Sequence, residues 1–138
     1  MKRGFGLVEV MVALAIIAIV LCAVTRLYVV STRTGAYADS LTYAASLAHS
    51  RLQMLKAAAF DDPALGPGWH TDADNPTQVA GRQYYLAWSV SVRGKGKGVT
   101  VYAAWNDRGE AGNFASADAL FDSGCGYTQA RGYIEALE

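Results

Sequence analysis

The sequence has few of the residues on which small disulfide-bonded, metal-binding or catalytic domains depend. Its 138 residues include two cysteines and two histidines. Cys22 lies in an apolar run and Cys125 lies between two glycines, which argues against a bond between them, and no Cys-x-x-Cys or His-x-His spacing is present. His49 and His70 are isolated, and nothing in the sequence brings Cys125 and His70 together as nucleophile and base. We therefore expect no metal site, no cofactor and no enzymatic activity.

A net charge of either sign is also absent, because 12 basic residues balance 12 acidic ones. This excludes an electrostatic field over the whole molecule of the kind that attracts nucleic acid or an anionic membrane surface. Such binding would have to depend on a local cluster of charges. The length fits one domain and excludes a multidomain enzyme, and 52% hydrophobic residues are too many for a disordered chain.

The apolar residues are concentrated near the N-terminus. Residues 10–24 carry neither a formal charge nor a hydroxyl group, and Glu9 is the only acidic or basic residue within residues 5–25. A helix of that length reaches ~30 Å, about the thickness of the hydrocarbon layer of a bilayer. We therefore expect residues 5–25 to span a membrane.

The flanking charges predict an orientation by a narrow margin. Lys2 and Arg3 precede the apolar run, and Arg26 and Arg33 follow it closely. The terminal amine adds one positive charge to the first group, and positive charges stay on the cytoplasmic side. We expect the N-terminus to be cytoplasmic.

Several kinds of membrane signal compete for this segment. A secretory signal needs small residues at a cleavage site after the apolar core, where the sequence offers only Cys-Ala-Val-Thr at residues 22–25, and a lipoprotein signal needs a small residue where Leu21 precedes Cys22. A plain single-pass anchor gives no reason for Glu9. Instead, the string GFGLVEVMVALA at residues 4–15, behind three residues that include Lys2 and Arg3, resembles the class III signal of type IV pilins and of type II secretion pseudopilins.

The resemblance implies that a prepilin peptidase cuts after Gly4 and methylates Phe5, and that Glu9 is the carboxylate used in assembly. One departure is Gly6, where the family usually has threonine or serine. A carboxylate in a membrane costs about 2.5–3.5 kcal/mol on insertion scales, so it needs compensation. The new ammonium of Phe5 on a neighbouring helix would supply it. Alternatively, Glu9 is hydrated at the level of the lipid headgroups.

The remaining sequence predicts an α+β domain. No proline occurs between Thr25 and Pro63, so one helix of roughly 80 Å is expected to run to Phe60, with its likeliest bend at residues 31–35 around Gly35. Its second half, residues 26–60, has an apolar stripe expected to lie on a sheet of the same chain, with Arg51 and other polar residues mostly elsewhere. The stripe comprises Leu41, Ala44, Ala45, Ala48, Leu52, Leu55 and Ala59.

Residues 61–138 are expected to form a small β-rich domain. Residues 64–81 are rich in Gly, Pro, Asp and Asn and indicate a long connection; a calcium loop there is not favoured, because Pro76 interrupts the EF-hand-like spacing of Asp72, Asp74 and Asn75. Residues 83–92 and 99–105 alternate in polarity, which predicts an antiparallel hairpin. Residues 106–109 indicate another turn. Residues 113–121 are interpreted as a third strand or an irregular segment, and residues 130–137 as a short helix or a last strand.

The aromatic residues of this domain are expected to belong to its core. They include Tyr84, Trp88 and Trp105, which lie in or beside the predicted hairpin. Trp69 is the exception, because its place in the predicted connection leaves a ligand contact open.

The predicted hairpin turn, residues 93–98, carries Arg93, Lys95 and Lys97 between glycines. We interpret this as a solvated turn with three positive charges at one tip; the alternative is contact with an anionic partner such as DNA or polysaccharide. A nucleic acid is not the expected partner, but the turn leaves it open.

Residues 47–60 and 101–107 also resemble minor pilins, with minor pseudopilins second. This implies a subunit that enters or primes a pilus and contacts other pilins, the peptidase, an inner-membrane assembly platform and lipid, with roles in adhesion or motility. The sequence divides accordingly into a leader 1–4, a membrane segment 5–25, an amphipathic half-helix 26–60 and a domain 61–138. It would lie in the inner membrane first and then in a pilus or periplasmic pseudopilus. The alternative of another class is a single-pass membrane-anchored envelope domain that binds a ligand or has enzymatic activity.

Overall fold

The computed structural model describes residues 6–106 and 114–135, and its first element is one long helix, α1 (Leu7–Ala57). The helix continues through Gly35, where the sequence predicted a bend. It ends at Ala57, three residues before the expected Phe60, and Pro63 then opens a short 3-10 turn, η1 (Pro63–Leu65). The chain forms two compact units, one up to Ala38 and one from Asp39, so α1 contributes to both.

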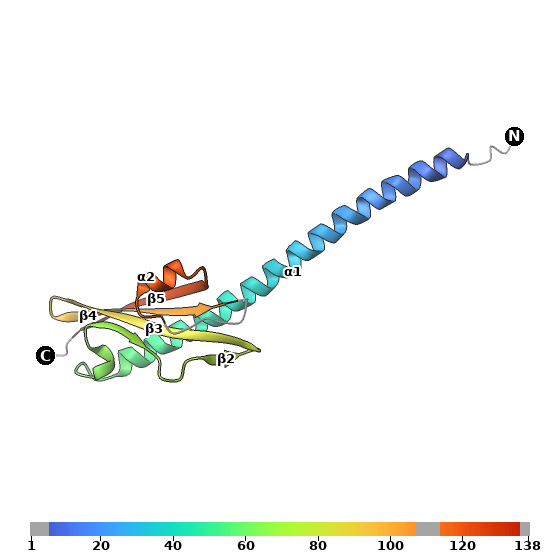
Figure 1. The fold of residues 1–138 in the computed structure, drawn as a ribbon. Helices are drawn as coiled ribbons and strands as arrows, with labels where there is room; N and C mark the ends of the chain where they lie inside the picture. Colours follow the sequence, from blue (N-terminus) through green and yellow to red (C-terminus); the bar gives the residue numbers. More distant parts are fainter. Residues whose placement is uncertain (1–5, 107–113, 136–138) are drawn as a thin grey trace. The chain divides into compact units, whose positions relative to one another are not determined.

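The second unit is built on an antiparallel sheet of five strands (Figure 1). The strands are β1 (Gly68–Thr71), β2 (Thr77–Val79), β3 (Arg82–Arg93), β4 (Gly96–Trp105) and β5 (Gly126–Glu135). Their order is β1-β3-β4-β5, and β2 pairs with β3 beside β1. The α+β fold and the β3–β4 hairpin confirm the prediction, and the last segment is a strand, one of the two alternatives left open.

The core lies between α1 and one face of this sheet. Ala44, Ala48, Leu52 and Leu55 of α1 are buried against the sheet. Their partners come from alternate positions of β3 and β4, namely Leu86, Trp88, Val90, Val99, Val101, Ala103 and Trp105. The predicted stripe was too wide, since Leu41, Ala45 and Ala59 are exposed, and Ser40 is buried instead. The helix buries a narrow stripe because a single sheet covers it from one side only.

A short helix, α2 (Ala117–Asp122), covers part of the opposite face of the sheet (Figure 1). The Ser116 hydroxyl caps it by accepting a hydrogen bond from the Ala119 amide at 3.1 Å. Leu120 is buried against Tyr102 and Ala104 of β4. The interpretation of this segment as a strand or irregular segment was therefore wrong, because a capped six-residue helix is too short to show helical periodicity.

Residues 64–81 also differ from the expected long connection, since they contain η1, β1 and β2. Asn75 lies between the two short strands and substitutes for a strand partner of β3. Its Oδ1 accepts from the Leu86 amide at 2.8 Å, and its Nδ2 donates to the Leu86 carbonyl at 2.8 Å. From Gly68 to Val79 the segment therefore follows the edge of β3, which fixes β1 and β2 although each is very short.

Candidate functional site

The first unit of the chain exposes an apolar surface over residues 6–25. Every residue from 6 to 35 is exposed, including Leu7, Met11 and Ile19, which are 80%, 64% and 71% exposed. An aliphatic side chain gains about 1.5–3 kcal/mol when it leaves water. A helix with such side chains around its full circumference therefore requires lipid or protein around it.

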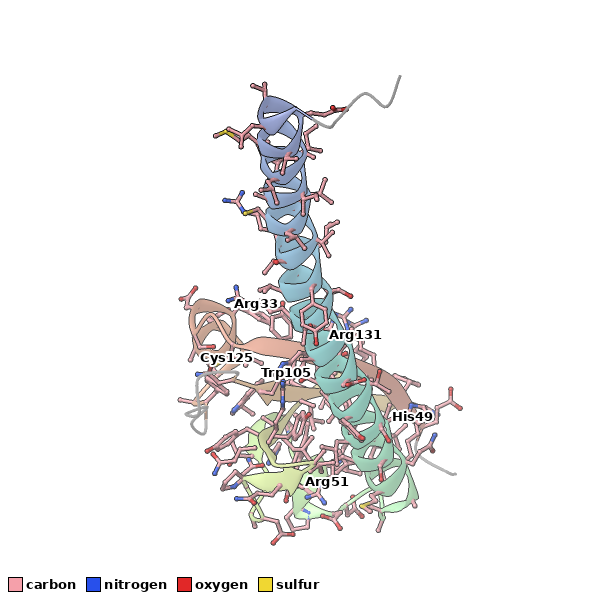
Figure 2. All side chains as sticks on the ribbon, turned by 90° about the vertical axis from the view of Figure 1, so that its right-hand side faces the viewer. Arg33, His49, Arg51, Trp105, Cys125 and Arg131 are labelled. Carbon is pink, nitrogen blue, oxygen red and sulfur yellow. The ribbon has the colours of Figure 1, made fainter. Side chains whose placement is uncertain are left out.

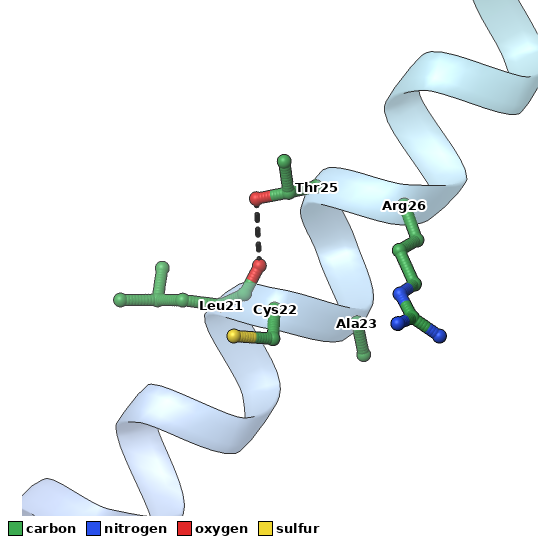
Figure 3. A pocket seen from close by; sticks show the side chains of 5 residues that line it. All are labelled: Leu21, Cys22, Ala23, Thr25 and Arg26. Carbon is green, nitrogen blue, oxygen red and sulfur yellow. Dashed lines mark hydrogen bonds between the residues drawn. The ribbon is translucent and has the colours of Figure 1, made fainter.

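The same segment is long and apolar enough to cross a membrane. An 18-residue window of α1 has a mean hydropathy of 3.0, and none of it is buried inside the chain. Thr25, at the end of the apolar run, donates its hydroxyl to the Leu21 carbonyl at 2.8 Å, so this polar group is satisfied within the helix (Figure 3). Cys22 is an exposed free thiol on the adjacent turn. Helical backbone with internally bonded hydroxyls is suited to a lipid environment.

Glu9 is the exception in this apolar surface. It lies in the first turn of α1, where its amide donates to the Gly6 carbonyl at 2.9 Å. Its exposed carboxylate forms no ion pair or hydrogen bond with another described residue. The amino end of a helix favours a negative charge, but that effect falls short of the cost of a carboxylate in lipid. A partner from outside the described chain is needed if Glu9 is to be buried.

The predicted processing residues, Gly4 and Phe5, lie outside the described residues. The comparison with known families covers this region. Residues 1–25 match the model of the prokaryotic N-terminal methylation motif.

The N-terminus carries a class III signal. This confirms the class III signal predicted from residues 4–15. Together with the apolar helix, the signal supports a precursor of the type IV pilin or pseudopilin kind that is anchored in a membrane. The motif implies processing by a prepilin peptidase and association with other pilin subunits. No curated protein and no solved structure matches the chain.

The three positive charges assigned to the hairpin tip do not lie together there. The two-residue connection between β3 and β4 is Gly94-Lys95, so Lys97 belongs to β4 and pairs with Val92. Lys97 donates to the Phe60 carbonyl at 2.5 Å, and its ammonium is 4.3 Å from the centre of the Phe60 ring. It therefore binds the segment after α1, on the core side of the sheet. The sequence missed this because strand alternation carries Lys97 to a different face from Arg93.

The histidines and the cysteine that were considered as catalytic or metal-binding residues do not form a common site. His49 lies on exposed α1 and contacts Gln53, and His70 contacts the Gly66 carbonyl at 2.7 Å and stacks on Trp88. Cys125, a free thiol, lies between α2 and β5, far from His49 (Figure 2). Among residues 6–106 and 114–135, no group of three His, Cys, Asp or Glu side chains is placed to hold a metal ion.

Asp72 and Trp69, which the sequence analysis considered as ligand contacts, both bond to other residues of the chain. Asp72 is buried and forms an ion pair with Arg51 of α1, with Nη2 and Oδ1 3.2 Å apart. Trp69 donates its indole N–H to the Phe114 carbonyl at 2.7 Å and packs on Tyr102. Sequence reasoning placed Arg51 on the polar face of the helix and missed this pair, because nothing local marks one arginine among several as the partner of a residue in a distant loop.

Proposed function

We propose that this protein is a minor type IV pilin. It is inserted in the bacterial inner membrane with its N-terminus in the cytoplasm, cut between Gly4 and Phe5, and packed through α1 into a pilus or its initiating complex. The observation that supports this most is that the methylation motif at residues 1–25 runs into a helix, α1, whose residues 7–35 are all exposed. The proposed role is structural, and its partners are other pilins, the peptidase, lipid and an assembly platform.

The apolar helix explains both environments of the proposed subunit. In the bilayer, lipid covers its side chains, so hydrophobic burial alone gives no reason for helices to associate. In a filament outside the bilayer, only helices of other subunits can exclude water from the same surface. The proposed division is a leader 1–4, a membrane segment 5–25, the second half of α1 from residue 26 to Ala57, and the domain that follows it.

Glu9 would decide the register in which subunits pack. Cleavage after Gly4 removes Lys2 and Arg3 and creates an ammonium on Phe5. In an array of apolar helices this ammonium and the Glu9 carboxylate of a neighbour attract strongly, because little water screens them. An unpaired carboxylate is costly there, so any register that leaves Glu9 without a cation is disfavoured.

Fractionation tests the filament role. An epitope-tagged chain in its own bacterium should be recovered in the filaments sheared from the cell surface, at a low ratio to the main subunit. Recovery only in the periplasm together with a secretion machine would favour the minor pseudopilin instead. Recovery only in the inner membrane, in cells that assemble filaments normally, would support a membrane-anchored binding domain and contradict the proposal.

A further inference from the structure

The face of the sheet opposite α1 is only partly covered by α2. Leu86, Trp88 and Val90 point to the core, so Ser91 and Arg93 belong to the opposite face, together with their cross-strand neighbours. The part of this face that none of the described elements covers contains an open depression of about 400 Å³. Its walls include Ser91, Arg93, Thr100, Arg131 and Tyr133, and Gly98 lies between them. The volume is in the range of small-molecule sites, about 300–1,000 Å³.

Two glycines of β4 shape the depression. A β-carbon at Gly98 would be 3.1 Å from Ser91 Oγ and 4.0 Å from Arg93 Cδ, so a side chain at this position would occupy the space beside both residues. The Tyr133 ring lies directly over Gly96, where a β-carbon would overlap it. The Tyr133 hydroxyl also donates to the Arg93 carbonyl at 2.9 Å, which holds this wall in place. The space above Gly98 is therefore bounded by Ser91, by Arg93 and by a Tyr133 ring that a hydrogen bond holds in place.

The lining is cationic and rich in hydroxyl groups. Neither Arg93 nor Arg131 forms an ion pair with a described residue, and Arg131 donates only to the Gln129 amide oxygen, at 3.3 Å. No acidic side chain of residues 6–106 or 114–135 lines the depression. A guanidinium group binds a carboxylate through two parallel hydrogen bonds, while the hydroxyls of Ser91, Thr100 and Tyr133 both donate and accept.

We propose that this depression binds a carboxylated sugar unit, such as one presented by an acidic polysaccharide. The carboxylate would lie between Arg93 and Arg131, the sugar hydroxyls would bond to Ser91 and Thr100, and the half-exposed Tyr133 ring would contact an apolar face of the sugar. A nucleic acid fits less well, because it requires a row of cations along several phosphates. Here the chain has no net charge and Lys97 is directed to Phe60 on the other face.

Nuclear magnetic resonance on the isotope-labelled full chain in detergent micelles tests this binding. Sodium D-glucuronate is titrated, with D-glucose as the neutral sugar, sodium acetate as the bare carboxylate and a short oligothymidylate as the nucleic acid. Glucuronate should shift the amides of Gly98, Thr100 and Arg131 saturably, and more tightly than each of the other three probes.

Three variants test the geometry. Arg131→Gln should weaken glucuronate binding about tenfold, since a charge-assisted bond is worth at least the 1.4 kcal/mol of a tenfold change. Arg33→Gln removes the same charge from exposed α1 and should leave binding unchanged. Gly98→Val should abolish binding by filling the depression. If this variant fails to fold, the comparison of Arg131→Gln with Arg33→Gln still tests the proposal.

Equal affinity for glucose or acetate, unchanged binding by Arg131→Gln, or tighter binding of the oligothymidylate to the same residues would each overturn the proposal. It does not depend on assembly into a filament, so a chain that fails to assemble but binds glucuronate would refute only the proposed function.

Discussion

Arg51 of α1 and Asp72, in the connection between β1 and β2, form an ion pair in which Asp72 is 7% exposed and Arg51 28% exposed. The Arg51 guanidinium also lies 4.9 Å from the centre of the Trp88 ring. One side chain of the helix thereby joins the two short edge strands to the core. The contact therefore adds to the few backbone pairs that hold β1 and β2 on the sheet.

Replacing Arg51 by alanine should lower the free energy of unfolding of the second unit by about 2–3 kcal/mol, because the buried Asp72 carboxylate would lose its cation. Urea unfolding followed by tryptophan fluorescence measures this unit alone, since all three tryptophans, Trp69, Trp88 and Trp105, lie in it. Arg131→Ala, on the exposed face, should change the value by less than about 0.5 kcal/mol. Equal effects of the two variants would show that the ion pair contributes nothing specific.

Asn75→Ala should destabilise the same unit by about 1–3 kcal/mol, because the Leu86 amide would lose its acceptor while remaining within the sheet. The Leu86 carbonyl would still accept from the Asp72 amide at 3.0 Å, so most of the loss arises at the amide. Asp74→Ala is the matched control, since this exposed side chain lies in the same connection. Urea unfolding that gives the same midpoint for both variants would contradict the role of Asn75 as a strand substitute.

Gly126→Val should also be destabilising, by about 1–3 kcal/mol, because a β-carbon at this position would lie 2.5 Å from Cε2 of the Trp105 ring. Trp105 is buried in the core, so its displacement should appear as a change in near-ultraviolet circular dichroism. Gly35→Ala, where the added carbon meets no atom within 4 Å, should leave that spectrum unchanged and add up to about 1 kcal/mol of helix stability. A native spectrum for Gly126→Val would contradict the observed packing.

The sequence predicted those helices and strands whose pattern of apolar residues repeats over many positions. The apolar run and the stripe through Ala44, Ala48 and Leu52 predicted α1, and the alternation from Tyr84 to Trp105 predicted the hairpin. The motif around Glu9 pointed to the candidate site, because a carboxylate within an apolar run can be recognised from the sequence alone.

Other elements depend on contacts between distant residues. β1 and β2 have four and three residues, too few for a visible period, and they exist because β3 offers an edge that Asn75 completes. The hairpin tip was misjudged for a related reason. The exact turn, Gly94-Lys95, decides which face each cation occupies, and a glycine-rich run allows several registers.

Glu9→Ala should leave membrane insertion and cleavage intact and reduce incorporation into filaments by about tenfold or more, because the Phe5 ammonium of a neighbouring subunit would be buried without a carboxylate, at a cost above the ~1.4 kcal/mol of that factor. Immunoblots of membrane and sheared-filament fractions measure both quantities. Glu135→Ala removes an exposed carboxylate from β5 and should incorporate normally. Wild-type incorporation of Glu9→Ala would remove the proposed role of this residue.

The mass of the mature chain, measured on protein purified from its own membrane, tests the central claim most directly. The account predicts a polypeptide that begins at Phe5, carries one added methyl group and lacks residues 1–4. In cells without prepilin peptidase, the same chain should keep all four residues. A mature chain that retains residues 1–4 in peptidase-positive cells would contradict the account.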